Sequence, residues 1–251
     1  FSLHVDSQCE IYGFLSGDGA FRVEGKRYRL SKPTILIVRD GEAHCFELFS
    51  QSPYEREVVH FNSDIFKELD PDGLLMEPFY NRPLGYGNLI SYDEEASERL
   101  WHYMRAMHST SADPKVQRLT LISNLLPLLY EIRMIYQEHQ QIRETLDAQD
   151  LIGIIVKYIN EHLNEALSTE LIAKKFFISQ SQINRLFNKQ IGSSVYQYIQ
   201  FKRLIKAQLM LRSGMAPGDV YLNCGYNDYS CFYKAYKKFF GVTPGLSLIH
   251  I

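Results

Sequence analysis

The sequence predicts an α+β protein in which an antiparallel β-barrel or sandwich is followed by a helical pair and then by an all-α domain. Short apolar runs broken by turn residues fill the first 61 residues, and apolar residues take helical spacing from about residue 93. A short helix, a turn and a second helix then occur twice in succession. We expect a β domain over residues 1–92, a helical pair over 93–140, a linker over 141–150 and a helical domain over 151–251.

The composition is that of an ordinary globular protein of 251 residues, with 45% hydrophobic and 22% charged residues. No run of about 18 apolar residues occurs, so we expect no membrane span and a cytoplasmic location. The cysteines lack the C-x-x-C spacing of metal and redox motifs, so we expect reduced thiols.

Charge is distributed unevenly along the chain. Residues 1–149 contain 15 Lys and Arg against 23 Asp and Glu, whereas residues 150–251 contain 12 against 6. A basic part joined to an acidic part indicates a polyanion-binding module attached to its own regulatory domain.

The first 61 residues predict antiparallel strands. The runs CEIYGFL, AFRVEG, TILIV and EREVVHF are separated by turn sequences such as SGDG and RDGE. Because successive side chains of a strand point to opposite faces, Glu10, Tyr12 and Phe14 should share one face of the sheet.

Two helices are predicted between the strands and the linker. Leu100, Met104 and Met107 recur at helical spacing in the first helix, and SADP supplies the break before the second. Leu119, Ile122, Leu126 and Leu129 recur at the same spacing in the second helix. Pro127 should kink or disturb the second helix. Both helices are so apolar that we expect an antiparallel pair that forms a homodimer.

Residues 151–192 predict three helices, of which the last two form a helix-turn-helix. Ser168 and Ser179 should act as N-caps, because a hydroxyl can accept the free amide protons of the first turn. Gly192 should end the third helix in a left-handed conformation. The outer face of that helix carries side chains that can pair with base edges or phosphates, namely Ser181, Gln182, Asn184, Arg185 and Lys189.

A long helix over about residues 194–212 should be followed by a second unit of the same kind. Gly225 should close its short helix and Asn227 should cap the next one, which runs to Gly241. The core-facing stripe of this last helix is predicted to be Phe232, Ala235, Tyr236, Phe239 and Phe240. The opposite face carries Tyr229, Ser230, Tyr233, Lys234 and Lys237.

A lysine-bearing face on a single amphipathic helix is usually only solvated surface. Two capped units in tandem, both basic on the outside, instead favour double-stranded DNA as the partner.

The C-terminal motifs resemble the AraC/XylS family of transcription regulators. IAKKF, the pattern S-x-x-x-I-x-R-L-F over residues 179–187, and FYKAYKKFFGVTP carry the resemblance, and GFLSGDGAF, VEGKRYRL and DGEAH are similar to the cupin-like sensing domain of many members. The family implies recognition helices that enter successive major-groove segments of promoter DNA, about 34 Å apart, and RNA polymerase as a further partner. Phe177 stands where the family has Gly, at a position that often needs a positive φ.

The resemblance to a cupin-like barrel also implies an effector site. Carboxylate, phenol, guanidinium and imidazole groups that converge on an enclosed space bind hydroxyl groups well. We therefore expect a small polar metabolite, such as a sugar, to bind at Glu10, Tyr12, Arg22, His44 and His60.

A metal site is the alternative that the same resemblance implies. His4, Glu10 and His44 would be its ligands, with Asp6 in the place of a further His. Such residues more often bind an organic effector or satisfy one another by hydrogen bonds, so we expect no metal and no other cofactor.

Two rival classes of function stay open beside an effector-responsive DNA-binding regulator. A metal-binding cupin enzyme with a helical appendage is disfavoured, because no complete metal set or acid–base pair stands out, and we expect no enzyme activity. A protein-interaction module would bind an acidic partner, and salt-dependent, sequence-selective binding to DNA distinguishes the regulator from it.

Overall fold

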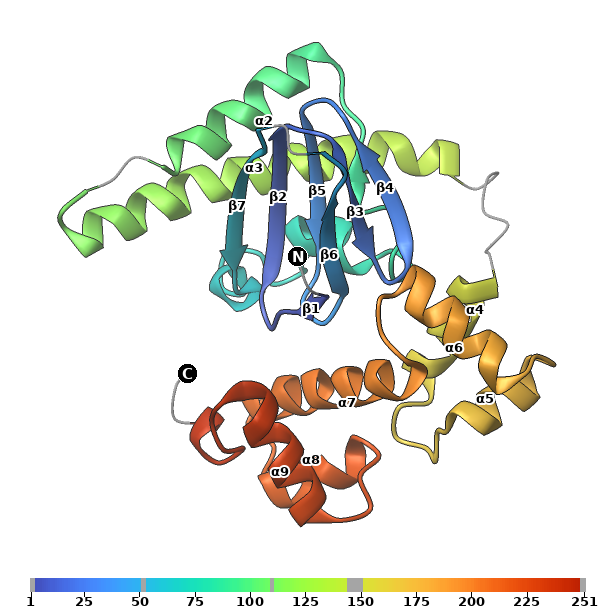
Figure 1. Cartoon of the computed structure of the whole chain (residues 1–251). Coiled ribbons are helices and arrows are strands. Elements are labelled where there is room, and N and C mark those ends of the chain that lie inside the picture. The colour runs from blue at the N-terminus through green and yellow to red at the C-terminus, as the bar shows by residue number, and fades with distance from the viewer. Residues whose placement is uncertain (1–2, 51–52, 109–110, 144–150, 249–251) are drawn as a thin grey trace.

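The computed structural model describes residues 3–50, 53–108, 111–143 and 151–248, and its N-terminal part contains two four-stranded antiparallel sheets (Figure 1). The first sheet has the strand order β1 (His4–Val5), β6 (Ala43–Leu48), β3 (Gly19–Val23) and β4 (Lys26–Leu30). The second has the order β7 (Glu55–Phe61), β2 (Cys9–Ser16), β5 (Thr34–Val38) and β8 (Leu89–Ile90). The predicted cupin-like barrel or sandwich is confirmed.

Aromatic side chains fill the space between the two sheets. Tyr12 and Phe14 of β2 contact the rings of Phe21 and Phe46, and all four are at most 2% exposed. The predicted alternation of β2 is confirmed, because Glu10 is buried on the same side of this strand.

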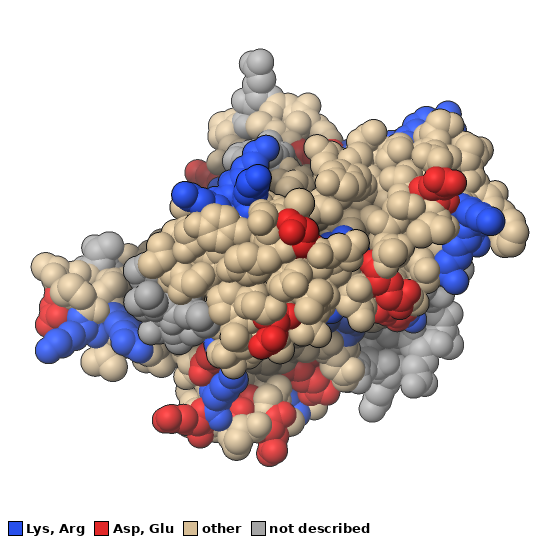
Figure 2. Space-filling model, turned by 90° about the horizontal axis from the view of Figure 1, so that it is seen from below, with Lys and Arg blue, Asp and Glu red and all other residues tan. Residues whose placement is uncertain are grey.

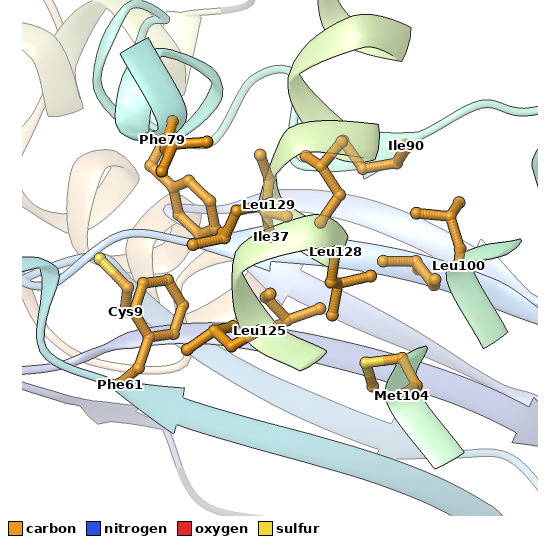
Figure 3. Close-up of a cluster of buried hydrophobic side chains, with 14 of the residues drawn as sticks. Cys9, Ile37, Phe61, Phe79, Ile90, Leu100, Met104, Leu125, Leu128 and Leu129 are labelled. Carbon is orange, nitrogen blue, oxygen red and sulfur yellow. The ribbon is translucent and has the colours of Figure 1, made fainter. Parts of the chain in front are cut away.

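Helices cover the outer face of the second sheet (Figure 1). They are α2 (Glu94–Ala106) and α3 (Pro114–Arg143), and the shorter elements η1 (Ser63–Phe66), η2 (Leu74–Met76) and α1 (Glu77–Tyr80) lie between β7 and β8. Figure 3 shows Leu100 and Met104 of α2 beside Leu125, Leu128 and Leu129 of α3 over the sheet. The predicted buried stripe of α2 is therefore confirmed.

The apolar stripe seen in the sequence of α3 is buried only toward the C-terminal end of the helix. Leu129 is fully buried, but Leu119 is 67% exposed and Ile122 36%. The residues that meet the sheet are Leu125, Leu128, Leu129 and Ile132. Ile122 lies seven residues before Leu129 and so shares its face, but none of residues 114–124 is buried. The spacing identifies the apolar face of α3, but it does not show how much of that face packs against the sheet. The helix continues through Pro127.

The C-terminal part is helical, as predicted. Its elements are α4 (Leu151–Glu161), α5 (Thr169–Lys175), α6 (Gln180–Gln190), α7 (Val195–Arg212), α8 (Pro217–Asn223), α9 (Tyr229–Phe240) and η3 (Leu246–Leu248). Ser168 and Ser179 accept hydrogen bonds from first-turn amides, so both predicted caps are confirmed. The cap of α9 is Asp228 rather than the expected Asn227, because the turn after Gly225 is longer than expected.

Residues 144–150, which make up most of the expected linker over 141–150, lie outside the described part of the chain. Residues 141–143, the first part of the expected linker, belong to α3, which ends at Arg143. No helix among the described residues is long and apolar enough to cross a membrane.

Candidate DNA-binding surface and effector domain

The first recognition helix, α6, presents most of its predicted DNA-facing side chains to solvent. Ser179 and Gln182 form a capping box that sets the start of the helix, since each side chain bonds the other residue's backbone amide. Ser181, Gln182, Arg185 and Lys189 are exposed. Asn184 is only half-buried, because its Oδ1 accepts from the amide of Val195 at 3.4 Å and so faces α7.

The second recognition helix, α9, has the two faces that its sequence predicts. Phe232 and Tyr236 are fully buried, whereas Phe239 lies at the edge of the buried face and is 36% exposed. Ser230, Lys234 and Lys237 are exposed on the other side.

Two tyrosines extend the outer face of α9. Tyr229 is 40% exposed and Tyr233 is half-buried, with their ring centroids 6.3 Å apart. The ring of Tyr229 also stands edge-on to that of Tyr221 in α8, at 5.6 Å. These contacts hold an aromatic surface beside the exposed lysines.

α7 contributes to the core of both helix-turn-helix units. Val195, Tyr198 and Ile199 pack with α4, α5 and α6, whereas Ala207 and Leu211 pack with α8 and α9. A single helix that is buried at both ends fixes the relative placement of the two units.

The face seen from the side of α8 and α9 shows basic and acidic side chains interspersed (Figure 2).

In the β domain, the structure brings three of the five predicted effector residues together. Oε2 of Glu10 lies 3.2 Å from Nε2 of His44 and 2.9 Å from Nε2 of His60. Burial alone would raise the pKa of Glu10, but the hydrogen bonds from the two imidazoles lower it to about 2. Burial works against the charged form of His44, yet the hydrogen bond to Glu10 raises its pKa.

Tyr12 lies deeper in the barrel, and Arg22 lies outside it. The Tyr12 hydroxyl is hydrogen-bonded to that of Tyr54, and its ring is 1% exposed. Arg22 points away from the interior, because its neighbours Phe21 and Val23 take the inward positions of β3. The expectation that Arg22 joins the effector site is therefore contradicted by its position.

The donor atoms of His4, Asp6, Glu10 and His44 all lie within 4.8 Å of one another. Imidazole nitrogens and carboxylate oxygens are ligands that divalent transition metals accept. Oε2 of Glu10 is also satisfied without an ion, because His44 and His60 are both hydrogen-bonded to it. The cluster lies at the end of the barrel where β1 pairs antiparallel with β6.

A buried contact that the sequence did not reveal joins the two parts of the chain. Nζ of Lys202 in α7 lies 2.7 Å from Oε1 of Glu24 and 2.5 Å from the carbonyl oxygen of Gly41. The Tyr198 hydroxyl donates to the same carboxylate. The sequence contained one signal of this contact, which is that Lys202 lies four residues after Tyr198 in an otherwise buried stripe. Nothing in the sequence identified Glu24 as the partner of that lysine.

Two arginines make further contacts between the parts. Nη1 of Arg22 donates to the carbonyl oxygen of Lys189, at the end of α6, at 2.9 Å, and Nη2 pairs with Glu47 at 2.5 Å. At the other end of α7, Arg212 donates to the carbonyl oxygen of Ser7 at 2.7 Å. The β domain therefore contacts the helix that joins the two recognition units and the end of the first one.

These features define a transcription regulator with a DNA-binding domain and a ligand-binding domain. Residues 1–129 match the family model described as AraC-like ligand binding domain, and residues 172–246 match a helix-turn-helix domain. The chain belongs to the AraC family of transcription regulators.

Bacterial relatives match either nearly the whole chain or a smaller part of it. The HTH-type transcriptional activator RhaS of Escherichia fergusonii is 22% identical over 97% of this chain and 86% of its own length. The regulatory protein SoxS of Salmonella typhimurium is 29% identical over 38% of this chain and 91% of its own length.

Two solved structures are also similar. An apo ToxT variant from Vibrio cholerae is 10% identical, covers 99% of this chain and 91% of its own, and has a TM-score of 0.45. The DNA-binding domain of AdpA, solved with a target DNA, is 22% identical over 41% of this chain and 93% of its own, with a TM-score of 0.39.

Proposed function

We propose that this regulator binds promoter DNA through α6 and α9 and that a small polar metabolite, sugar-like in its chemistry, controls this binding through the β domain. One observation carries the proposal: α7 packs against both recognition helices and also contacts the β domain through the ion pair between Lys202 and Glu24. A conformational change in the β domain would therefore shift α7, and with it both helix-turn-helix units.

The outer faces of the recognition helices supply two kinds of DNA contact. Arg185 and Gln182 offer the paired donors and the amide that read guanine and adenine in the major groove. Lys189, Lys234 and Lys237 offer positive charge to phosphates. Tyr229 and Tyr233 lack the fork of an arginine, so we expect the second unit to read thymine methyl groups and DNA shape.

The effector site that we propose lies at the end of the barrel rather than inside it. Tyr12, Phe21 and Phe46 occupy the interior, so a sugar-sized ligand has no room below Glu10. His60 is 45% exposed and Asp6 37%, and both lie beside Glu10. Hydroxyl groups of a ligand can bond these carboxylates and imidazoles at the surface.

A second candidate effector site lies between the two parts of the chain. A cavity of about 220 Å³ beside the end of α7 is lined by Ser7, Cys9, Asp40, Asn62, Ser63, Asp64, Lys67, Leu209, Arg212 and Ser213. A ligand bound there would touch both parts at once. Its polar lining suits the same class of metabolite.

Thermal-shift measurements with sugars, polyols and hydroxy acids on the full chain separate the two sites. Loss of the shift in Glu10→Gln, with the shift retained in Arg212→Ala, supports the end of the barrel. The opposite pattern supports the cavity. If none of these compounds raises the melting temperature, a polar metabolite is not the effector.

Selection of bound sequences from random DNA, run with and without the stabilising metabolite, tests the whole function. We expect an enriched sequence with two half-sites about one helical turn apart. Enrichment of no sequence, or binding that depends on salt alone, would contradict a sequence-specific regulator. In this proposal the exposed first part of α3, which includes Leu119 and Ile122, forms the homodimer contact. RNA polymerase is the partner through which bound dimers act on transcription.

A further inference from the structure

The turn between α5 and α6 holds a bulky residue in a conformation that bulky residues avoid. Phe177 has a φ of +57°, in the left-handed region, and its side chain is 96% exposed. A side chain with a Cβ is strained there, and strain of this kind persists where the surrounding structure imposes it, often at functional sites. No burial of the Phe177 ring offsets that strain.

The second helix-turn-helix unit of the same chain makes the same turn with glycine. Gly225 has a φ of +77°, and its amide bonds to the carbonyl oxygen of Leu222 at 3.0 Å, as the amide of Phe177 bonds to that of Lys174 at 3.3 Å. The next amide in each turn reaches back five residues, from Ile178 to Ala173 and from Tyr226 to Tyr221, at 3.0 Å in both. The backbone of the turn therefore needs no aromatic residue.

Packing explains the glycine in the second turn but not the phenylalanine in the first. A Cβ at Gly225 would lie 2.3 Å from the carbonyl oxygen of Leu163, so a side chain does not fit there. In the first turn it is Phe176 that packs inward, with its ring 5.6 Å from that of Tyr158. The Phe177 ring contributes little to the core of its own chain.

The place of Phe177 indicates what its ring contacts. It precedes Ser179, the N-cap of α6, by two residues, and exposed Lys174 and Lys175 lie just before it. The first residues of a recognition helix contact base edges, so the turn that leads into them comes close to the duplex. Lysines at the end of α5, next to this turn, suit the phosphates on either side of the groove.

We propose that Phe177 is a DNA contact, and that its ring packs on the apolar surface of a nucleotide, a deoxyribose or a thymine methyl, at the edge of the groove that α6 enters. The inference rests on the proposed function, because it assigns a residue to the same DNA interface. It adds an apolar contact to the first helix-turn-helix unit, whose other proposed DNA contacts are polar or charged. The strained backbone conformation of Phe177 is then explained by a contact that forms only when the protein binds DNA.

The test compares the full chain with Phe177→Gly and Phe177→Asn, using DNA sites recovered by selection with the unchanged protein. Glycine relieves the strain and asparagine tolerates the left-handed region, so both variants should keep or raise the melting temperature. Both should bind the selected sites about 10-fold more weakly, the loss expected for one good contact. Leu69→Asn, which removes a 65% exposed side chain from the β domain, should bind as the unchanged protein does.

Sites in which deoxyuridine replaces thymidine distinguish the two nucleotide surfaces. If the ring packs on a thymine methyl, one such replacement weakens binding of the unchanged protein and has no further effect on Phe177→Gly. If it packs on deoxyribose, every replacement changes the affinity of both proteins by the same factor, and the 10-fold difference between them remains.

Three results would overturn the proposal. The variants would bind with unchanged affinity and sequence preference, or they would melt at lower temperature, which would make the ring part of the fold. In the third, they would keep DNA binding but lose polymerase-dependent transcription, which would assign the ring to a protein. Failure of the unchanged protein to select any DNA would instead refute the proposed function itself.

Discussion

Lys202 and Glu24 form a buried ion pair with an Nζ–Oε1 distance of 2.7 Å, although 178 residues separate them along the chain. Glu24 also accepts from the amide of Ala43 at 2.9 Å and from the hydroxyl of Tyr198. Three donors therefore satisfy one carboxylate in the contact between the β domain and α7. This contact is the best place to separate the two parts of the chain by a single substitution.

Lys202→Met should loosen the contact, because it leaves the Glu24 carboxylate buried without a counter-charge. Breaking a buried pair in this way costs about 3–5 kcal/mol, and separation of α7 from the β domain relieves that cost by exposing Glu24 to water. We expect a larger radius of gyration by small-angle scattering. Lys206→Met, one turn along the same helix, is the control for loss of charge. A compact Lys202→Met variant whose DNA binding still responds to the effector would show that the pair does not couple the domains.

Arg185→Ala should reduce the discrimination between selected and mismatched DNA by about 1–3 kcal/mol, since a guanidinium reads guanine through two hydrogen bonds. Competition binding with single-base variants of the selected site measures this loss. The loss should concentrate at one base pair. An unchanged preference at every position would remove Arg185 from the base-reading set.

Lys237→Ala should weaken binding to all sequences alike and lower the slope of log affinity against log salt by about 1, because a lysine at a phosphate releases counterions without reading sequence. Titrations at several salt concentrations test this. A sequence-dependent loss would instead place Lys237 at a base.

Leu119→Glu should weaken the homodimer, since Leu119 is 67% exposed in the first part of α3, where residues 114–124 include no buried side chain. A charge at the centre of an apolar contact is left without a partner when the contact forms. Sedimentation of the variant should show a shift toward monomer. The control is Leu171→Glu, a 53% exposed leucine of α5 that should leave the dimer intact. Equal sedimentation of both variants would contradict a dimer contact on α3.

Gly13→Ala should destabilise the β domain by about 1–3 kcal/mol, because it overpacks a filled core. A Cβ at Gly13 would lie 2.9 Å from the ring of Trp101, where α2 packs on β2. Urea unfolding measures the loss. Gly218→Ala is the matched control, since a Cβ there meets nothing within 4 Å, and alanine in a helix should stabilise the chain slightly. A Gly13→Ala variant as stable as the unchanged chain would show that α2 shifts freely over the sheet.

The sequence by itself determined the features that depend on near neighbours. The caps at Ser168 and Ser179 and the alternation of Glu10 and Tyr12 are all present. Each of these features follows from the geometry of a few consecutive residues, so the sequence alone is enough to predict it.

The tertiary structure alone decided which surfaces meet. It placed Arg22 against the end of α6 instead of the effector site, turned Leu119 of α3 to solvent, and buried Lys202 against Glu24. A strand or helix with two plausible faces buries the one for which a partner exists, and that partner comes from a distant part of the chain. Periodicity describes the faces of an element, but only packing between elements chooses among them.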